Sequence, residues 1–160
     1  MSTLVIVHVV ISLIAIVAGL VVMFKMLGSD RAAGLTAIFL LFTILTNVTG
    51  FFIPPFLQDK FLPSHAIGIL SLVLLAIACF ALYSQKLGGM WRWVYVVTAL
   101  VSLYLNCFVL VIQSFLKIPA LTALAPGNPP SGPVFAVVQG IVLVFFVIMT
   151  IGAVRRFRPA

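Results

Sequence analysis

The chain has 160 residues, of which 64% are hydrophobic and only 7% are charged. Soluble domains carry about 25% charged residues, so this composition, with a mean hydropathy of +1.38, excludes a soluble globular protein. The net charge of +7 does not indicate nucleic-acid binding. The basic residues stand singly in predicted loops and cluster only near the C-terminus, where the cytoplasmic flank of a last span is expected. We expect a lipid bilayer as the partner and no nucleic acid.

Five apolar stretches recur along the chain, and each is long enough to cross about 30 Å of hydrocarbon. In lipid the backbone must satisfy its own hydrogen bonds, and stretches of this length without strict alternation favour helices over barrel strands. The predicted spans cover residues 3–27, 33–53, 64–84, 91–116 and 134–154. The sequence therefore predicts an all-α bundle of five transmembrane helices that forms one domain over residues 1–160.

The distribution of basic residues predicts the orientation of this bundle. Cytoplasmic loops of membrane proteins carry an excess of Lys and Arg. With five spans the basic residues divide seven to two: Lys25, Arg31, Lys86, Arg92, Arg155, Arg156 and Arg158 on one side, and Lys60 and Lys117 on the other. This division predicts an outer N-terminus and a cytoplasmic C-terminus.

With that orientation, the polar side chains inside the spans fall mostly in the outer half, and every helix contributes at least one. Polar groups that face lipid cost free energy, so we expect them to point into the bundle and line a common pocket. The alternative is structural, because such groups commonly tie membrane helices together for about 0.6 kcal/mol each. The predicted pocket residues, apart from the two histidines, are Ser12, Asn47, Gly68, Asn106, Gln113 and Gln139.

The two histidines, His8 and His65, are predicted to lie at a similar shallow depth on two different helices. Two neutral imidazoles are the axial ligands that a b-type haem iron takes. Ser12 and Gly68 are small enough to admit the macrocycle. Lys60 and Lys117 are outer-side cations that could pair with its propionates.

Two other interpretations of the histidines stay open. A quinone headgroup accepts or donates hydrogen bonds at a helix cleft, and His, Asn and Gln supply them here. Alternatively, the histidines are plain packing residues. Zinc fits less well, because a closed site takes four ligands and the outer side offers only Asp59 besides the two histidines.

The leading functional hypothesis is a small membrane redox protein that transfers electrons through a haem b or a quinone. The alternative is a non-catalytic membrane subunit or scaffold, which packs against a larger complex or against a second copy of itself. Its 14 phenylalanines and small-residue stripes suit that role. Solute transport is weaker, because no acidic residue or pair of broken helices marks a coupling site. An enzymatic activity lacks support, because no nucleophile–base pair or carboxylate dyad is visible. The question of an enzyme is left open.

Several segments carry a resemblance that covers nearly the whole chain. They are residues 49–55 (TGFFIPP), 62–68 (LPSHAIG), 104–109 (YLNCFV), 117–121 (KIPAL) and 154–159 (VRRFRP). With these segments the chain resembles a family of small bacterial inner-membrane proteins of unknown function. The resemblance implies a multi-pass protein of the bacterial inner membrane. It transfers no active-site residue.

Overall fold

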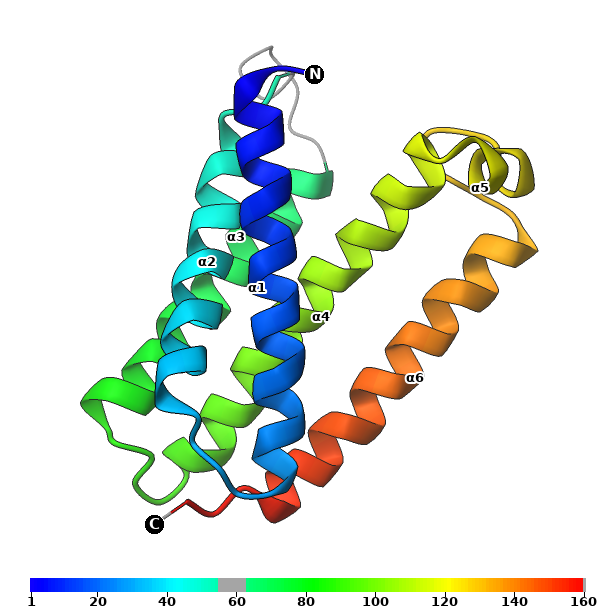
Figure 1. The fold of residues 1–160 in the computed structure, drawn as a ribbon. Coiled ribbons are helices and arrows are strands. Elements are labelled where there is room, and N and C mark those ends of the chain that lie inside the picture. The colour runs from blue at the N-terminus through cyan, green and yellow to red at the C-terminus, as the bar shows by residue number, and fades with distance from the viewer. Residues whose placement is uncertain (55–62, 160) are drawn as a thin grey trace.

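The computed structural model describes residues 1–54 and 63–159, and every regular element in these ranges is a helix (Figure 1). Five helices are long and apolar enough to cross a membrane, which confirms the predicted helix count and the class of multi-pass membrane protein. The elements are α1 (Thr3–Leu27), α2 (Ala33–Phe51), α3 (Pro63–Cys79) with its π-helical continuation η1 (Phe80–Ser84), α4 (Trp91–Lys117), α5 (Pro119–Leu124) and α6 (Pro133–Arg156).

The helices differ from the predicted spans in three respects, besides shifts of one or two residues at the ends of other helices. α2 ends at Phe51 instead of residue 53, because Ile53 precedes Pro54 and a residue before proline is disfavoured in helical conformation. The third span is not a uniform α-helix, since its last turn is the π-helix η1. The short helix α5, with Pro119 in its first turn, was not predicted.

The basic residues gather at one end of the bundle. The loop at 28–32, the loop at 85–90 and the C-terminal residues share this end, whereas the N-terminus and α5 lie at the other (Figure 1). Two contacts join the segments at the basic end: the backbone N–H of Arg158 donates to Oγ of Ser29 at 2.7 Å, and Nη1 of Arg92 donates to the carbonyl oxygens of Val154 and Phe157 at 2.9 and 2.7 Å. We refer to the two ends as the basic end and the N-terminal end.

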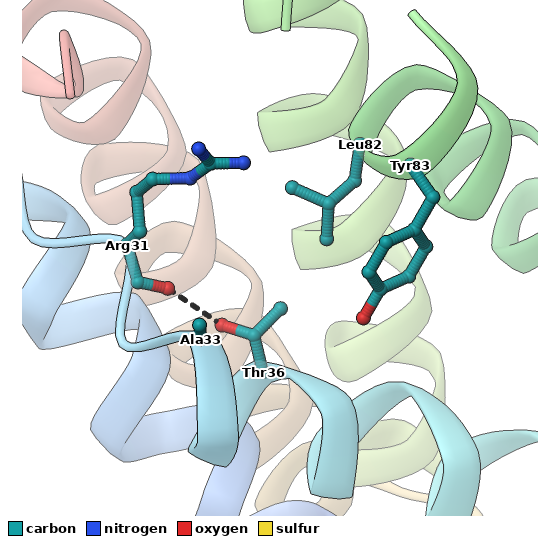
Figure 2. Close-up of a pocket in the computed structure, with 5 residues that line it drawn as sticks. All are labelled: Arg31, Ala33, Thr36, Leu82 and Tyr83. Carbon is teal, nitrogen blue, oxygen red and sulfur yellow. Dashed lines mark hydrogen bonds between the residues drawn. The ribbon is translucent and has the colours of Figure 1, made fainter. Parts of the chain in front are cut away.

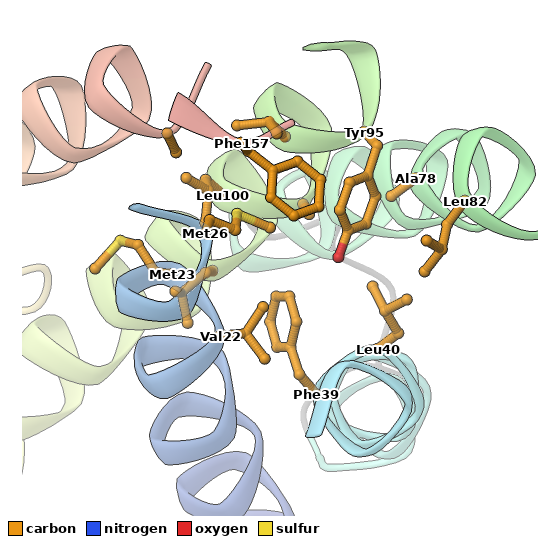
Figure 3. Close-up of a cluster of buried hydrophobic side chains, with 14 of the residues drawn as sticks. Val22, Met23, Met26, Phe39, Leu40, Ala78, Leu82, Tyr95, Leu100 and Phe157 are labelled. Atoms are coloured by element: carbon orange, nitrogen blue, oxygen red, sulfur yellow. The ribbon is translucent and has the colours of Figure 1, made fainter. Parts of the chain in front are cut away.

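The core forms where α1, α2 and α4 cross. Gly19 of α1 is buried at this crossing, and a Cβ placed there would lie 2.6 Å from Cδ1 of Leu103 and 2.8 Å from the ring of Phe39. The absence of a side chain therefore lets three helices approach one another closely. Large side chains fill the space between this crossing and the basic end, among them Met23, Met26, Phe39, Tyr95, Leu100 and Phe157 (Figure 3).

Helix α6 packs mainly along α4. The ring pairs Tyr104–Phe146 and Phe115–Phe135 join the two helices, with centroids 5.7 and 5.4 Å apart. Beyond the crossing, α4 and α6 lean away from α1, α2 and α3 toward the N-terminal end (Figure 1). The half of the protein toward the N-terminal end therefore consists of two groups of helices.

We expect Gly19→Ala to destabilise the fold by about 1–3 kcal/mol, because the new methyl group overpacks the crossing. Thermal unfolding of the detergent-purified protein measures the change. Gly140→Ala is the matched control, since a Cβ at Gly140 has no neighbouring atom within 4 Å. Equal melting temperatures for the two variants would contradict a tight crossing at Gly19.

Candidate functional site at the N-terminal end

His8 is held against the last turn of α2. Its Nδ1 lies 2.8 Å from Oγ1 of Thr49, and a Cβ at the adjacent Gly50 would lie 3.3 Å from the ring atom Cε1 of His8. Gly50 therefore makes room for the imidazole beside α2. The ring is partly buried, so it lies at the edge of the α1–α2 contact.

The contact with Thr49 links the tautomer of His8 to the direction of the Thr49 hydroxyl. Oγ1 of Thr49 also lies 2.8 Å from the carbonyl oxygen of Leu45 and 3.2 Å from that of Thr46. If the hydroxyl donates to one of these carbonyls, its oxygen accepts from Nδ1 of His8, and the lone pair of the imidazole is at Nε2. If the hydroxyl donates to Nδ1, the proton of the imidazole is at Nε2. We expect the first arrangement, which presents Nε2 as an acceptor or ligand atom.

His65 meets the same turn of α2 from another helix. Its buried imidazole lies beside the ring of Phe51, with centroids 6.1 Å apart and the planes inclined by 24°. A Cβ at Gly68, one turn along α3, would lie 3.1 Å from Cζ of Phe51. Gly68 therefore accommodates the Phe51 side chain. His8 and His65 contact neighbouring residues of α2 and lie at the same end of the protein, as predicted.

Asn47 connects α2 to α3 one helical turn before Phe51, farther from the N-terminal end of the protein. Its Nδ2 donates to Oγ of the buried Ser71 at 3.1 Å and to the carbonyl oxygen of Thr43 at 2.8 Å. Ser12, in contrast, donates its hydroxyl hydrogen back to the carbonyl oxygen of Val9 in its own helix at 2.8 Å. The structure thus brings His8, His65, Asn47 and Gly68 around the C-terminal half of α2.

The polar residues of α4 and α6 are arranged differently. Gln139 of α6 is buried, and its Nε2 donates to the carbonyl oxygen of Phe108 at 3.1 Å, so it ties α6 to α4. Asn106 lies two residues from Phe108, which is about 200° around the helix, and therefore on the opposite side of α4. Gln113 and Lys117 are exposed.

Two of these amides keep unused hydrogen-bonding capacity. Within residues 1–54 and 63–159, the buried atoms Nδ2 of Asn106 and Oε1 of Gln139 have no hydrogen-bond partner. Gly19 of α1 and Leu103 of α4 meet at the crossing. His8 lies eleven residues along α1 from Gly19, whereas Asn106 lies only three residues along α4 from Leu103. Asn106 is therefore about two helical turns deeper in the protein than His8. The predicted pocket residues thus divide between the two groups of helices. Lys60 and Asp59 lie outside the described residues.

Thr49 is the residue that the sequence prediction of the site did not include. It lies two residues from Asn47 and thus about 200° around α2, so α2 presents Asn47 to α3 and Thr49 to α1. The prediction for this helix included Asn47 and did not include Thr49. The sequence does contain a signal for a second polar face on α2. Thr46 and Thr49 are three residues apart, which places them on one side of a helix.

The arrangement fits a small headgroup better than a macrocycle. The space that Gly68 leaves on the surface of α3, which we call the notch at Gly68, is filled by the ring of Phe51. Each histidine contacts α2 separately. In the part of the chain that the structure describes, no group of three or more His, Cys, Asp or Glu residues could hold a metal ion. Thr49 contacts Nδ1 of His8, so Nε2 is the second ring nitrogen through which His8 could contact a ligand.

Comparison with known proteins finds no matching family model, no similar curated protein and no similar solved structure. Membership in the family of small inner-membrane proteins stays a prediction from the segments quoted above.

We expect Thr49→Val to remove the preference of His8 for protonation at Nδ1, because the acceptor at 2.8 Å is lost. Nitrogen NMR of the protein labelled at histidine distinguishes the two tautomers. Thr49→Ser, which keeps the hydroxyl, is the matched control and should leave the spectrum unchanged. Protonation of His8 at Nε2 in the unaltered protein would refute the assignment.

Proposed function

We propose that this chain is a small membrane redox protein that binds a quinol headgroup at His8. The observation that carries the proposal is the contact between Nδ1 of His8 and Thr49. We infer that Nδ1 donates in this contact, which leaves Nε2 with a lone pair. A quinol has hydroxyl groups that donate to such an atom, whereas the carbonyl oxygens of the oxidised quinone cannot. The site is therefore suited to the reduced form.

Two features of the surroundings support this proposal. His8 is only partly buried, so a headgroup can approach from the membrane while its isoprenoid tail stays in lipid. Lys117, the last residue of α4, is a cation toward the same end of the protein, and it would attract an oxygen that gains negative charge when a quinol loses a proton. Contacts between α2 and α3 support the helix on which His8 packs. They are made by His65 with Phe51 and by Asn47 with Ser71.

A b-type haem ligated by His8 and His65 ranks below a quinol. Such a haem needs both imidazoles aimed at one iron and room for the macrocycle between them. α1 and α3 both pack on α2, and the Phe51 ring fills the notch beside His65. A haem would require these helices to separate.

The proposed location is the bacterial inner membrane, with the N-terminus outside and the C-terminus in the cytoplasm. Seven basic residues flank the spans at the basic end, and the positive-inside rule places such an end in the cytoplasm. The His8 site then opens toward the outer leaflet.

Calorimetric titration tests the proposal with decylubiquinol and decylubiquinone as probes. We expect the quinol to bind about fivefold more tightly than the quinone, as one hydrogen bond allows. His8→Ala should remove this difference, and Ser114→Ala, whose hydroxyl bonds to its own helix, should keep it. Equal affinities in the unaltered protein would reject the quinol site. A b-type difference spectrum lost in both His8→Ala and His65→Ala would favour haem instead.

A non-catalytic subunit that associates with itself or with a larger complex is the second candidate. Only 6% of the apolar window of α6 is buried, against 28–39% in the other four spans. Its most exposed side chains share one face at spacings of four, three and four: Val137, Ile141, Val144 and Ile148. Membrane helices associate through such faces when their side chains pack closely.

Native mass spectrometry in detergent tests this second candidate. We expect a dimer that Ile141→Trp weakens by disturbing the α6 face. Val10→Trp is the control, because Val10 is exposed on α1 and lies outside that face. A monomer at all protein concentrations would count against self-association and leave only a foreign partner.

A further inference from the structure

A small pocket lies at the basic end, far from His8. It is formed by Arg31, Ala33, Thr36, Leu82 and Tyr83, and its volume is about 50 Å³ (Figure 2). One side belongs to the loop and first turn of α2, and the other to η1. A water molecule needs about 10–15 Å³ by the same measure, so the pocket has room for one polar group of several atoms and not for a whole ligand.

Arg31 contributes a cation to the wall of the pocket, and the neighbouring acid Asp30 is engaged by other groups. Lys25 and Asp30 pair at 3.0 Å, and the backbone N–H of Ala32 also donates to Asp30 at 2.8 Å. These two contacts, the Ala32 bond first, hold the pKa of Asp30 below its ordinary value. Asp30 is thus engaged with Lys25. In the described part of the chain, no salt bridge or side-chain hydrogen bond engages the guanidinium of Arg31.

The backbone of the loop fixes Arg31 in place beside the pocket. Its carbonyl oxygen accepts a hydrogen bond from Oγ1 of Thr36 at 2.9 Å, as Figure 2 shows. In Figure 2 the guanidinium points toward Leu82, which stands between it and Tyr83 in this view, and the Tyr83 hydroxyl points down to the level of Thr36. A guanidinium and a phenol O–H together supply several donors and one full positive charge, which is the set that a phosphate accepts.

The π-helix η1 places Tyr83 at this pocket. The backbone N–H of Gln85 donates to the carbonyl oxygen of Phe80, five residues back, at 3.0 Å. A π turn contains more residues than an α turn, so it rotates Leu82 and Tyr83 away from the direction that a continuous α-helix would give them. π turns inside α-helices are frequent at functional sites, and here the turn lines the pocket with an aromatic hydroxyl.

We propose that this pocket binds the phosphate group of an anionic phospholipid. Its place at the ends of two membrane-spanning helices matches the depth of lipid headgroups, and Leu82 and Ala33 provide an apolar wall beside the glycerol and the first acyl carbons. Arg31 makes the charged contact, and Tyr83 donates the second hydrogen bond. The proposal does not depend on the quinol site at the other end.

Native mass spectrometry of the full chain in detergent tests the pocket with phosphatidylglycerol as the probe. We expect Arg31→Gln to weaken the tightest lipid adduct about tenfold, the effect of one lost charge-assisted hydrogen bond. Tyr83→Phe should weaken it less, and both variants should fold, because each side chain is exposed. Arg155→Gln is the matched control, since it removes the same charge at the same end but does not line the pocket.

Two further probes separate the alternatives. Diacylglycerol has the acyl chains without the phosphate, so its binding should not respond to Arg31→Gln; equal retention of both lipids would overturn the proposal. An equal loss of phosphatidylglycerol in Arg155→Gln and Arg31→Gln would also overturn it, because general surface charge would then explain the adduct. Binding of inorganic phosphate that depends on Arg31, without retention of the lipid, would reject a lipid as the ligand.

Discussion

The close approach of three helices at Gly19 is the constraint on which the rest of the structure depends. Because Gly19 has no side chain, Phe39 of α2 and Leu103 of α4 meet directly on α1, and the core side chains pack from this crossing to the basic end. Beyond it, α4 leans away and takes α6 with it. The half toward the N-terminal end therefore divides into two groups of helices, and the predicted pocket residues divide with them.

Hydrogen bonding in an apolar medium decides how the polar side chains are used. Most hydroxyl groups bond to carbonyl oxygens of their own helix, as Thr43, Thr98 and Ser102 do, because a helix always offers an acceptor one turn back. Few polar contacts cross between helices. Those that do, such as the contact of His8 with Thr49 and that of Asn47 with Ser71, hold α2 to its two neighbours.

The two ends of the protein carry different chemistry. At the N-terminal end, Thr49 contacts Nδ1 of His8, and Nε2 is the nitrogen that we propose as the acceptor. At the basic end, Arg31 stands beside a pocket sized for one polar group, and a π turn directs Tyr83 toward it. A protein with both features would bind a redox-active headgroup near one surface and a lipid headgroup near the other. Each site can be tested without the other.

The sequence by itself determined the five spans and the grouping of basic residues at one end, because length, hydropathy and charge act locally along the chain. It also located His8 and His65 at the same end. Only the tertiary structure decided that Phe51 fills the notch at Gly68, that Asn106 and Gln139 lie on opposite sides of α4, and that Thr49 is the partner of His8. Those outcomes depend on how helices rotate and tilt against one another, which packing at Gly19 controls and periodicity does not specify.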